Sequence, residues 1–367
     1  AFEELGIKID YISGTSSGSM AASLYAMGCN PDEIKKIIFE SYKNLVKIPK
    51  KPIISSVGTY ITKKQLRLEG LISGERVENL IQNAANEKKY KNINEILSLE
   101  FKLSARLASK LIRNKKIYKN NFIVDTRDPI AFGDTIIINL DLFEDNSNII
   151  PLKMNLDILY EDEWFLVVNK PAGIAIHPSV THYNNSLSNG IKYYFDLINL
   201  HKKIRPVNRL DFDTSGLVIF AKCEYIQEMF SRQMANGDFK KYYLCIVDGT
   251  LSKKSGIIDL PIGRKKDSII ERCISIDGQT SITNYRVLKE SHNISLIQCK
   301  LETGRTHQIR VHMQALGHPI IGDTLYGNKS SLINRQALHS YKIECIHPVT
   351  YKKIEFLSEL PKDMQIL

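Results

Sequence analysis

The first residues that could do chemistry are Gly14–Gly18, where Ser16 stands in a G-x-S-x-G pattern. The pattern follows an apolar stretch at Ile7–Ile12 and precedes a helical pattern that runs to Tyr25. Glycines permit a tight turn from strand to helix, and such a turn exposes a serine hydroxyl near the helix N-terminus. Ser16 is therefore a candidate nucleophile for acyl transfer.

The wider phrase ELGIKIDYISGTSSGSMAASLYAMGCNPDEI resembles the patatin-like phospholipases, and the resemblance covers roughly residues 1–96. It implies a lipid acyl hydrolase with an upstream glycine-rich oxyanion loop and an aspartate in a downstream Asp-Gly motif. We expect the chain to begin after the oxyanion loop. It also has no Asp-Gly pair before Asp248 that could supply the partner aspartate. Without oxyanion donors roughly 10²–10³ in rate is lost, and without a base the hydroxyl is a poor nucleophile. We therefore expect a hydrolase fragment with a vestigial Ser16, and keep a working lipid hydrolase as the alternative.

A basic segment at residues 102–119 contains seven Lys or Arg residues and no acidic one. Four of its cations step by four, four and three residues, which is the spacing of one helical face. Like charges at that spacing are unfavourable unless a polyanion offsets them, so we predict phosphate binding over the alternative of a solvated surface helix. The predicted RNA-binding residues of this segment are Lys102, Arg106, Lys110, Arg113, Lys115 and Lys116.

Length and composition limit the kinds of fold that can position these residues. The 367 residues predict two or three domains, and 43% hydrophobic residues suffice for real cores. The net charge of +10 favours a polyanionic partner. The longest uncharged stretch, Tyr11–Pro31, contains five Ser and three Gly, so we expect no membrane span. Six scattered Cys residues indicate reduced thiols in the cytoplasm and no metal site.

A second set of residues that could do chemistry is spread over the C-terminal two thirds of the chain. Its centre is RPVNRLDFDTSG, which precedes an apolar segment, LVIFAK. The set closely resembles the RluA/RluD-type RNA pseudouridine synthases over about residues 97–367, and the basic segment resembles their S4 RNA-binding domain. The five motifs are Asn169–Ser179, Arg205–Gly216, Lys241–Leu244, Leu301–Met313 and Gly317–Gly327.

The resemblance implies isomerisation of uridine to pseudouridine without any cofactor. Asp211 would be the catalytic carboxylate, and Arg305 the guanidinium that keeps it charged. Tyr243 would stack on the uracil. The target base must be flipped out of the RNA, and Arg209 would fill the gap it leaves. Arg310 would contact phosphate or support the sheet.

One departure from the family pattern is Asn208, which stands where these enzymes usually have His. We interpret it as a tolerated change, because Arg209, Asp211 and the Thr-Ser-Gly that follows are kept. An RNA-binding protein that has lost catalysis is the alternative. The expected substrate is structured RNA, ribosomal or alternatively transfer RNA, and we expect a monomer.

The strand and helix patterns predict an α+β protein whose catalytic domain has a mixed, largely antiparallel sheet. We expect an incomplete patatin-like α/β segment at residues 1–96 and a small α/β S4-like domain at 97–141. A polar linker would follow at 142–155, and the catalytic domain would occupy 156–367.

Overall fold

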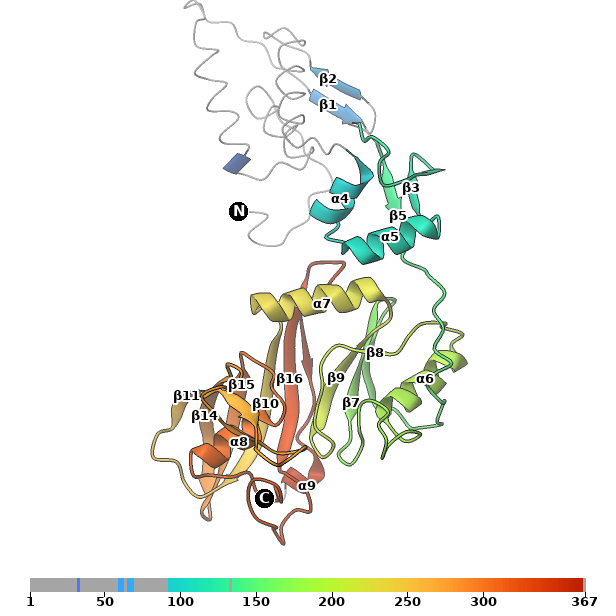
Figure 1. Ribbon diagram of the computed structural model, residues 1–367. Helices are drawn as coiled ribbons and strands as arrows, with labels where there is room; N and C mark the ends of the chain where they lie inside the picture. The colour runs from blue at the N-terminus through green and yellow to red at the C-terminus, as the bar shows by residue number, and fades with distance from the viewer. Residues whose placement is uncertain (1–31, 34–58, 63–64, 69–91, 132–133, 366–367) are drawn as a thin grey trace, which may run out of the picture. The chain divides into compact units, whose positions relative to one another are not determined.

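The computed structural model describes residues 32–33, 59–62, 65–68, 92–131 and 134–365, so Ser16 and its glycines lie outside the described residues. The chain divides into two compact units, Ala1–Asn139 and Leu140–Leu367. Figure 1 shows the elements of each. No helix in the described ranges is long and apolar enough to cross a membrane.

In the described part of the first unit, the helices α4 and α5 accompany small antiparallel sheets. One of these sheets pairs β1 with β2, and another has the order β4-β3-β5. The elements are β1 (Thr59–Thr62), β2 (Gln65–Leu68), α4 (Ile93–Leu99), α5 (Ala105–Arg113), β3 (Ile117–Lys119), β4 (Phe122–Ile123) and β5 (Ile136–Ile138).

Helix α5 carries the basic segment, and it is shorter than its charge pattern predicts. Ser104 is the N-cap, because its hydroxyl accepts the backbone N–H of Leu107. Lys102 therefore lies before the helix with a left-handed backbone (φ 53°), and its predicted place on the helical face is wrong. Leu107 and Leu111 are buried on the inner face, as their spacing predicts.

The second unit is built on a ten-stranded sheet with the order β11-β14-β15-β10-β16-β9-β7-β6, in which β17 also pairs with β16 and β8 with β9. Only β16 and β9 are parallel within this sheet, which confirms the predicted mixed, largely antiparallel architecture. Its strands are β6 (Ile158–Glu161), β7 (Phe165–Lys170), β8 (Arg205–Pro206), β9 (Ser215–Ala221), β10 (Lys240–Asp248), β11 (Ser255–Asp259), β14 (Ile282–Ser291), β15 (Ile294–Leu301), β16 (Leu338–Ile346) and β17 (Lys353–Leu357). The helices are α6 (Leu187–Leu197), α7 (Glu224–Asn236), α8 (Gln308–Ala315) and α9 (Lys362–Gln365).

Strand β9 is completely buried because α7 packs on one face of the sheet around it and α6 packs on the other. Alternate residues point to opposite faces. Leu217 and Ile219 pack in a core with Phe230 of α7, whereas Val218 and Phe220 pack in another that contains α6. The strand that follows Asp211 is thus the rigid centre of the unit.

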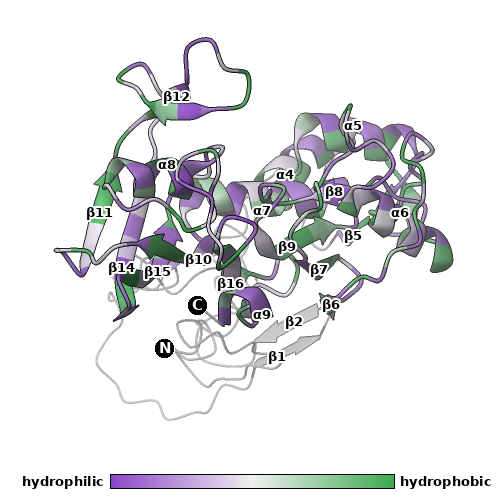
Figure 2. Cartoon of the chain, turned by 90° about the horizontal axis from the view of Figure 1, so that it is seen from below, coloured by the Kyte–Doolittle hydropathy of each residue, from purple (hydrophilic) through white to green (hydrophobic). Residues whose placement is uncertain are grey.

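Two segments lie at the margins of this unit. Residues 142–155, the expected linker, contain no helix or strand, and the Glu144 carboxylate binds the Arg205 guanidinium at 2.6 and 2.7 Å. This ion pair fastens the segment to the second unit. A hairpin of β12 (Ile262–Arg264) and β13 (Arg272–Ile274) extends away from the sheet, as Figure 2 shows.

Candidate active site

The loop that carries Asp211 is fixed to β9 by a buried side chain. The amide of Asn208 donates from Nδ2 to the carbonyl of Leu217 at 2.9 Å. Its Oδ1 accepts the backbone N–H of Ile219 at 3.0 Å. Asn208, the departure from the family pattern, therefore ties the start of the loop to the strand that the loop enters.

The same loop is held from a second side by Lys170, whose side chain is fully buried at the end of β7. Its Nζ donates to three backbone carbonyls, those of Pro171, Ile174 and Phe212, each at 2.9 Å. An ammonium group has three protons, so these acceptors use all of them. Burial lowers the pKa of Lys170 to about 7, although the nearby Asp213 and Asp211 partly oppose the shift. Because Phe212 follows Asp211, this contact fixes the backbone beside the candidate catalytic carboxylate.

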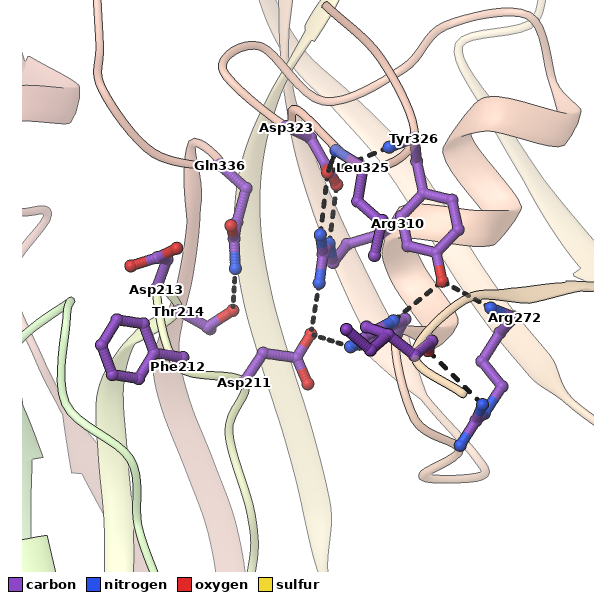
Figure 3. A network of polar contacts seen from close by, with 12 residues as sticks. Asp211, Phe212, Asp213, Thr214, Arg272, Arg310, Asp323, Leu325, Tyr326 and Gln336 are labelled. Carbon is purple, nitrogen blue, oxygen red and sulfur yellow. Dashed lines mark hydrogen bonds and ion pairs between the residues drawn. The ribbon is translucent and has the colours of Figure 1, made fainter. Parts of the chain in front are cut away.

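A buried arginine links Asp211 to a second carboxylate (Figure 3). Arg310 donates to Asp323 from Nε at 2.6 Å and from Nη2 at 2.8 Å, and its Nη1 lies 3.3 Å from Oδ2 of Asp211. Asp323 is fully buried and also accepts the backbone N–H groups of Leu325 and Tyr326. Burial opposes the charge of Arg310, but Asp323 and Asp211 outweigh it and raise its pKa.

This arrangement corrects the predicted partner of Asp211. Arg305 is exposed in the loop before α8, where its Nε donates to the carbonyl of Thr280 at 3.1 Å. Arg310 lies within the first turn of α8, which packs into the core, and its side chain is only 8% exposed. The cation in contact with Asp211 is therefore Arg310. Its predicted contact with RNA phosphate stays a prediction.

These residues lie at one pocket of about 970 Å³ in the second unit. Asp211, Arg209, Tyr243, Arg305 and Arg310 all line it. The site residues predicted for the second unit are thus brought together, although their roles remain predictions. The predicted RNA-binding residues between Lys102 and Lys116 belong to the first unit.

Tyr243 and Arg209 occupy the pocket in different ways. Tyr243 lies on β10 between β15 and β16, and its side chain is buried. Burial raises the pKa of Tyr243, so its phenol is neutral at physiological pH. Arg209 is exposed, and after burial its charge is the second factor that lowers the pKa of His177. A neutral aromatic ring in the wall and an exposed cation at the same pocket suit a flipped base.

Sequence reasoning missed four residues of this site: Lys241, His307, Asp323 and Tyr326. Asp323 and Tyr326 stand in GHPIIGDTLYG, so their motif gave a signal although no role was assigned. Lys241 lines the pocket, and its Nζ is close to Gly304. A Cβ added to Gly304 would lie 2.9 Å from this Nζ. His307 lies with its Nε2 4.0 Å from Oδ2 of Asp211.

Comparison with known proteins finds similar sequences and a similar solved structure. A family model described as RNA pseudouridylate synthase matches residues 164–315. The uncharacterized RNA pseudouridine synthase YhcT of Bacillus subtilis is 39% identical over 274 residues, which cover 74% of this chain and 90% of YhcT. The ribosomal large subunit pseudouridine synthase D of Zymomonas mobilis is 40% identical over 232 residues, covering 59% of this chain and 73% of that protein. The solved structure of human RNA pseudouridylate synthase domain containing 1 is 28% identical, with a TM-score of 0.47 over 56% of this chain and 83% of that one.

The chain therefore belongs to the RNA pseudouridine synthase family. A second family model, patatin-like phospholipase, matches residues 1–146. That match extends past the predicted boundary at residue 96 and includes the basic segment of α5.

Proposed function

We propose that this chain isomerises uridine to pseudouridine in large-subunit ribosomal RNA, with Asp211 as the essential group. The observation that carries the proposal is the ion pair between the buried Arg310 and the partly exposed Asp211 at the wall of a pocket large enough for a nucleotide. A relative that is 40% identical is named as a ribosomal large subunit pseudouridine synthase, which supports the choice of RNA.

The reaction sets the demands on the pocket. The N1–C1′ glycosidic bond breaks, the uracil turns, and a C5–C1′ bond forms. N1 ends with a proton and the hydrogen on C5 leaves as a proton, so no electrons are gained or lost. An ionised carboxylate can assist as a nucleophile or as a base. Arg310 pairs with the Asp211 carboxylate, and Asp323 in turn fixes the position of Arg310.

The remaining pocket residues take supporting roles in the proposal. Tyr243 would stack on the flipped uracil, because its neutral ring forms part of the pocket wall. Arg209, which is exposed at the same pocket, would fill the space that the base leaves in the RNA stack. Arg305, which is also exposed there, would contact the backbone of the RNA.

The first unit would add affinity for RNA. Arg113 and Lys115 are exposed in and just after α5, so they can reach phosphates. We propose the S4-like role for this unit on that charge pattern. Action on ribosomal RNA would place the protein in the cytoplasm.

Release of tritium from ribosomal RNA labelled with 5-³H-uridine tests the proposal, since attachment through C5 liberates that hydrogen. The full chain should release tritium, and Asp211→Asn should abolish release while RNA binding is kept. Asp213→Asn is the matched control, because it removes a carboxylate two residues away and should leave release within about threefold. Release from transfer RNA alone would refute the proposed substrate. Full activity of Asp211→Asn, or no release from either RNA, would refute the proposed function.

A further inference from the structure

The two carboxylate oxygens of Asp211 have different surroundings. Oδ2 lies 3.3 Å from Nη1 of Arg310 and 4.0 Å from Nε2 of His307. Within the part of the chain that the structure describes, Oδ1 has no hydrogen bond or ion pair. The side chain of Asp211 is 25% exposed at the pocket, so Oδ1 is the oxygen left for a substrate.

A chain of hydrogen bonds sets the orientation of the His307 ring. Its Nδ1 lies 2.8 Å from the hydroxyl of Tyr326, and the two rings meet edge to face. The same hydroxyl accepts the backbone N–H of Arg272 at 2.8 Å (Figure 3). A tyrosine hydroxyl has one proton, and with Arg272 as its donor it can give that proton to Nδ1. The proton of a neutral His307 is then on Nε2, the nitrogen that faces Asp211.

The backbone at His307 is unusual in a way that serves this orientation. His307 is the N-cap of α8 with a left-handed backbone, φ 58°, which costs about 1 kcal/mol or more in a residue other than glycine. The turn is fixed by Oε1 of Gln308, which accepts from Thr303 at 2.8 Å and from the backbone of Arg305 at 2.9 Å. Strain of this kind is retained where the surrounding structure enforces it, and it is common at active sites.

We propose that His307 is a positioning residue: its Nε2–H and Arg310 together engage Oδ2 of Asp211 and leave Oδ1 to face the uridine. The 4.0 Å separation closes to hydrogen-bond length when RNA fills the pocket, as catalytic contacts commonly do on substrate binding. Burial lowers the pKa of His307, with Asp211 opposing the shift, so the neutral ring that this role requires is the form at pH 7. The inference rests on the proposed function of Asp211.

Two substitutions distinguish the roles of the two ring nitrogens of His307. Asn adopts a left-handed backbone readily and can place a polar atom near the position of Nδ1, but it does not reach Asp211. Gln can place an N–H near the position of Nε2. In single-turnover tritium release from 5-³H-uridine-labelled ribosomal RNA, His307→Asn should be slower by about 10- to 100-fold, and His307→Gln by less than about tenfold. RNA affinity should change little in either variant.

His292→Asn is the matched control, because His292 also has a left-handed backbone, φ 48°, but is exposed in the turn between β14 and β15. It should release tritium like the parent protein. His307→Gln should be faster than His307→Asn, although Gln is less suited than Asn to the left-handed backbone. A merely structural defect at this turn would instead make His307→Gln the slower variant.

Tyr326→Phe provides an independent check, since the hydroxyl acts on Asp211 through His307. The variant should lose about three- to tenfold in rate, and adding it to His307→Asn should cause no further loss. A His307→Asn rate within twofold of the parent, or a His307→Gln rate no faster than that of His307→Asn, would overturn the inference. An inactive parent protein would instead refute the proposed function, so the two failures are distinguishable.

Discussion

Arg310 is held by Asp323 through two hydrogen bonds, at 2.6 and 2.8 Å, so that its remaining nitrogen points at Asp211. Arg310 and Asp323 are thirteen positions apart in the sequence, and both are buried. Their planar pairing fixes the direction of the guanidinium as well as its charge. The electrostatics of the candidate site therefore depend on a carboxylate that does not itself line the pocket.

The first prediction concerns the replacement of this guanidinium. Arg310→Lys keeps a positive charge, but an ammonium cannot bind Asp323 in two places and still reach Asp211. We expect single-turnover tritium release to fall by more than about 100-fold, because the reacting carboxylate loses its fixed partner. Arg305→Lys is the control in the same motif, and its exposed side chain predicts a loss below about tenfold. The reverse order of the two losses would show that Arg305 is the functional partner.

The second prediction concerns Asn208. Asn208→Asp keeps the acceptor for the N–H of Ile219 but loses the donor to Leu217, and it buries a charge beside a carbonyl. We expect a loss of about 2–4 kcal/mol in the free energy of unfolding, measured with urea. Asn208→His should instead form pseudouridine within about fivefold of the parent rate, because the Asn208 amide binds the backbone of β9. A large gain in activity with His would support the alternative of an RNA-binding protein impaired by Asn208.

The fold class and the members of the pocket could be predicted from sequence because each motif is short and continuous. Asp211 precedes the apolar strand β9 and Tyr243 lies within β10, each in a motif that resembles the family, and both line the pocket. The distinction between Arg305 and Arg310 could not be predicted in this way. It depends on where α8 begins, and the left-handed backbone at His307 determines that start. The pairing of Arg310 with Asp323 is likewise a contact between segments that no local pattern reveals.

The basic segment shows the same limit at one residue. A regular spacing placed Lys102 on the helical face, but the Ser104 cap starts the helix three residues later in the chain than that spacing requires. The spacing alone could not exclude a longer helix, because it contains no information on capping.

The third prediction is a pH dependence of stability from Lys170. Burial lowers its pKa to about 7 in the folded protein, against 10.5 for an ordinary lysine. Between these values the unfolded chain binds the proton and the folded chain does not, so this residue adds stability as pH rises. The gain is at most about 1.4 kcal/mol per pH unit between these two values, and it is fully lost once the pH has fallen to about 7.

Urea unfolding at pH 6 and pH 8.5 measures this effect. Lys170→Met and Lys170→Arg both lack the titration, since Met has no charge and Arg stays charged. The parent protein should therefore gain stability relative to both variants at the higher pH. A difference that is the same at the two pH values would show that Lys170 keeps its proton and its three carbonyl acceptors throughout this range.

The fourth prediction concerns the salt dependence of RNA binding by the first unit. Arg113 and Lys115 are exposed, and binding to phosphate releases counterions. The double replacement Arg113→Ala and Lys115→Ala in the full chain should reduce the slope of log Kd against log salt by about 0.7–0.9 for each phosphate that is no longer neutralised. Lys352→Ala with Lys353→Ala removes the same charge from exposed residues at β17 and should leave the slope unchanged. Equal reductions in the two double variants would mean that net charge alone, and no defined surface on the first unit, governs the affinity for RNA.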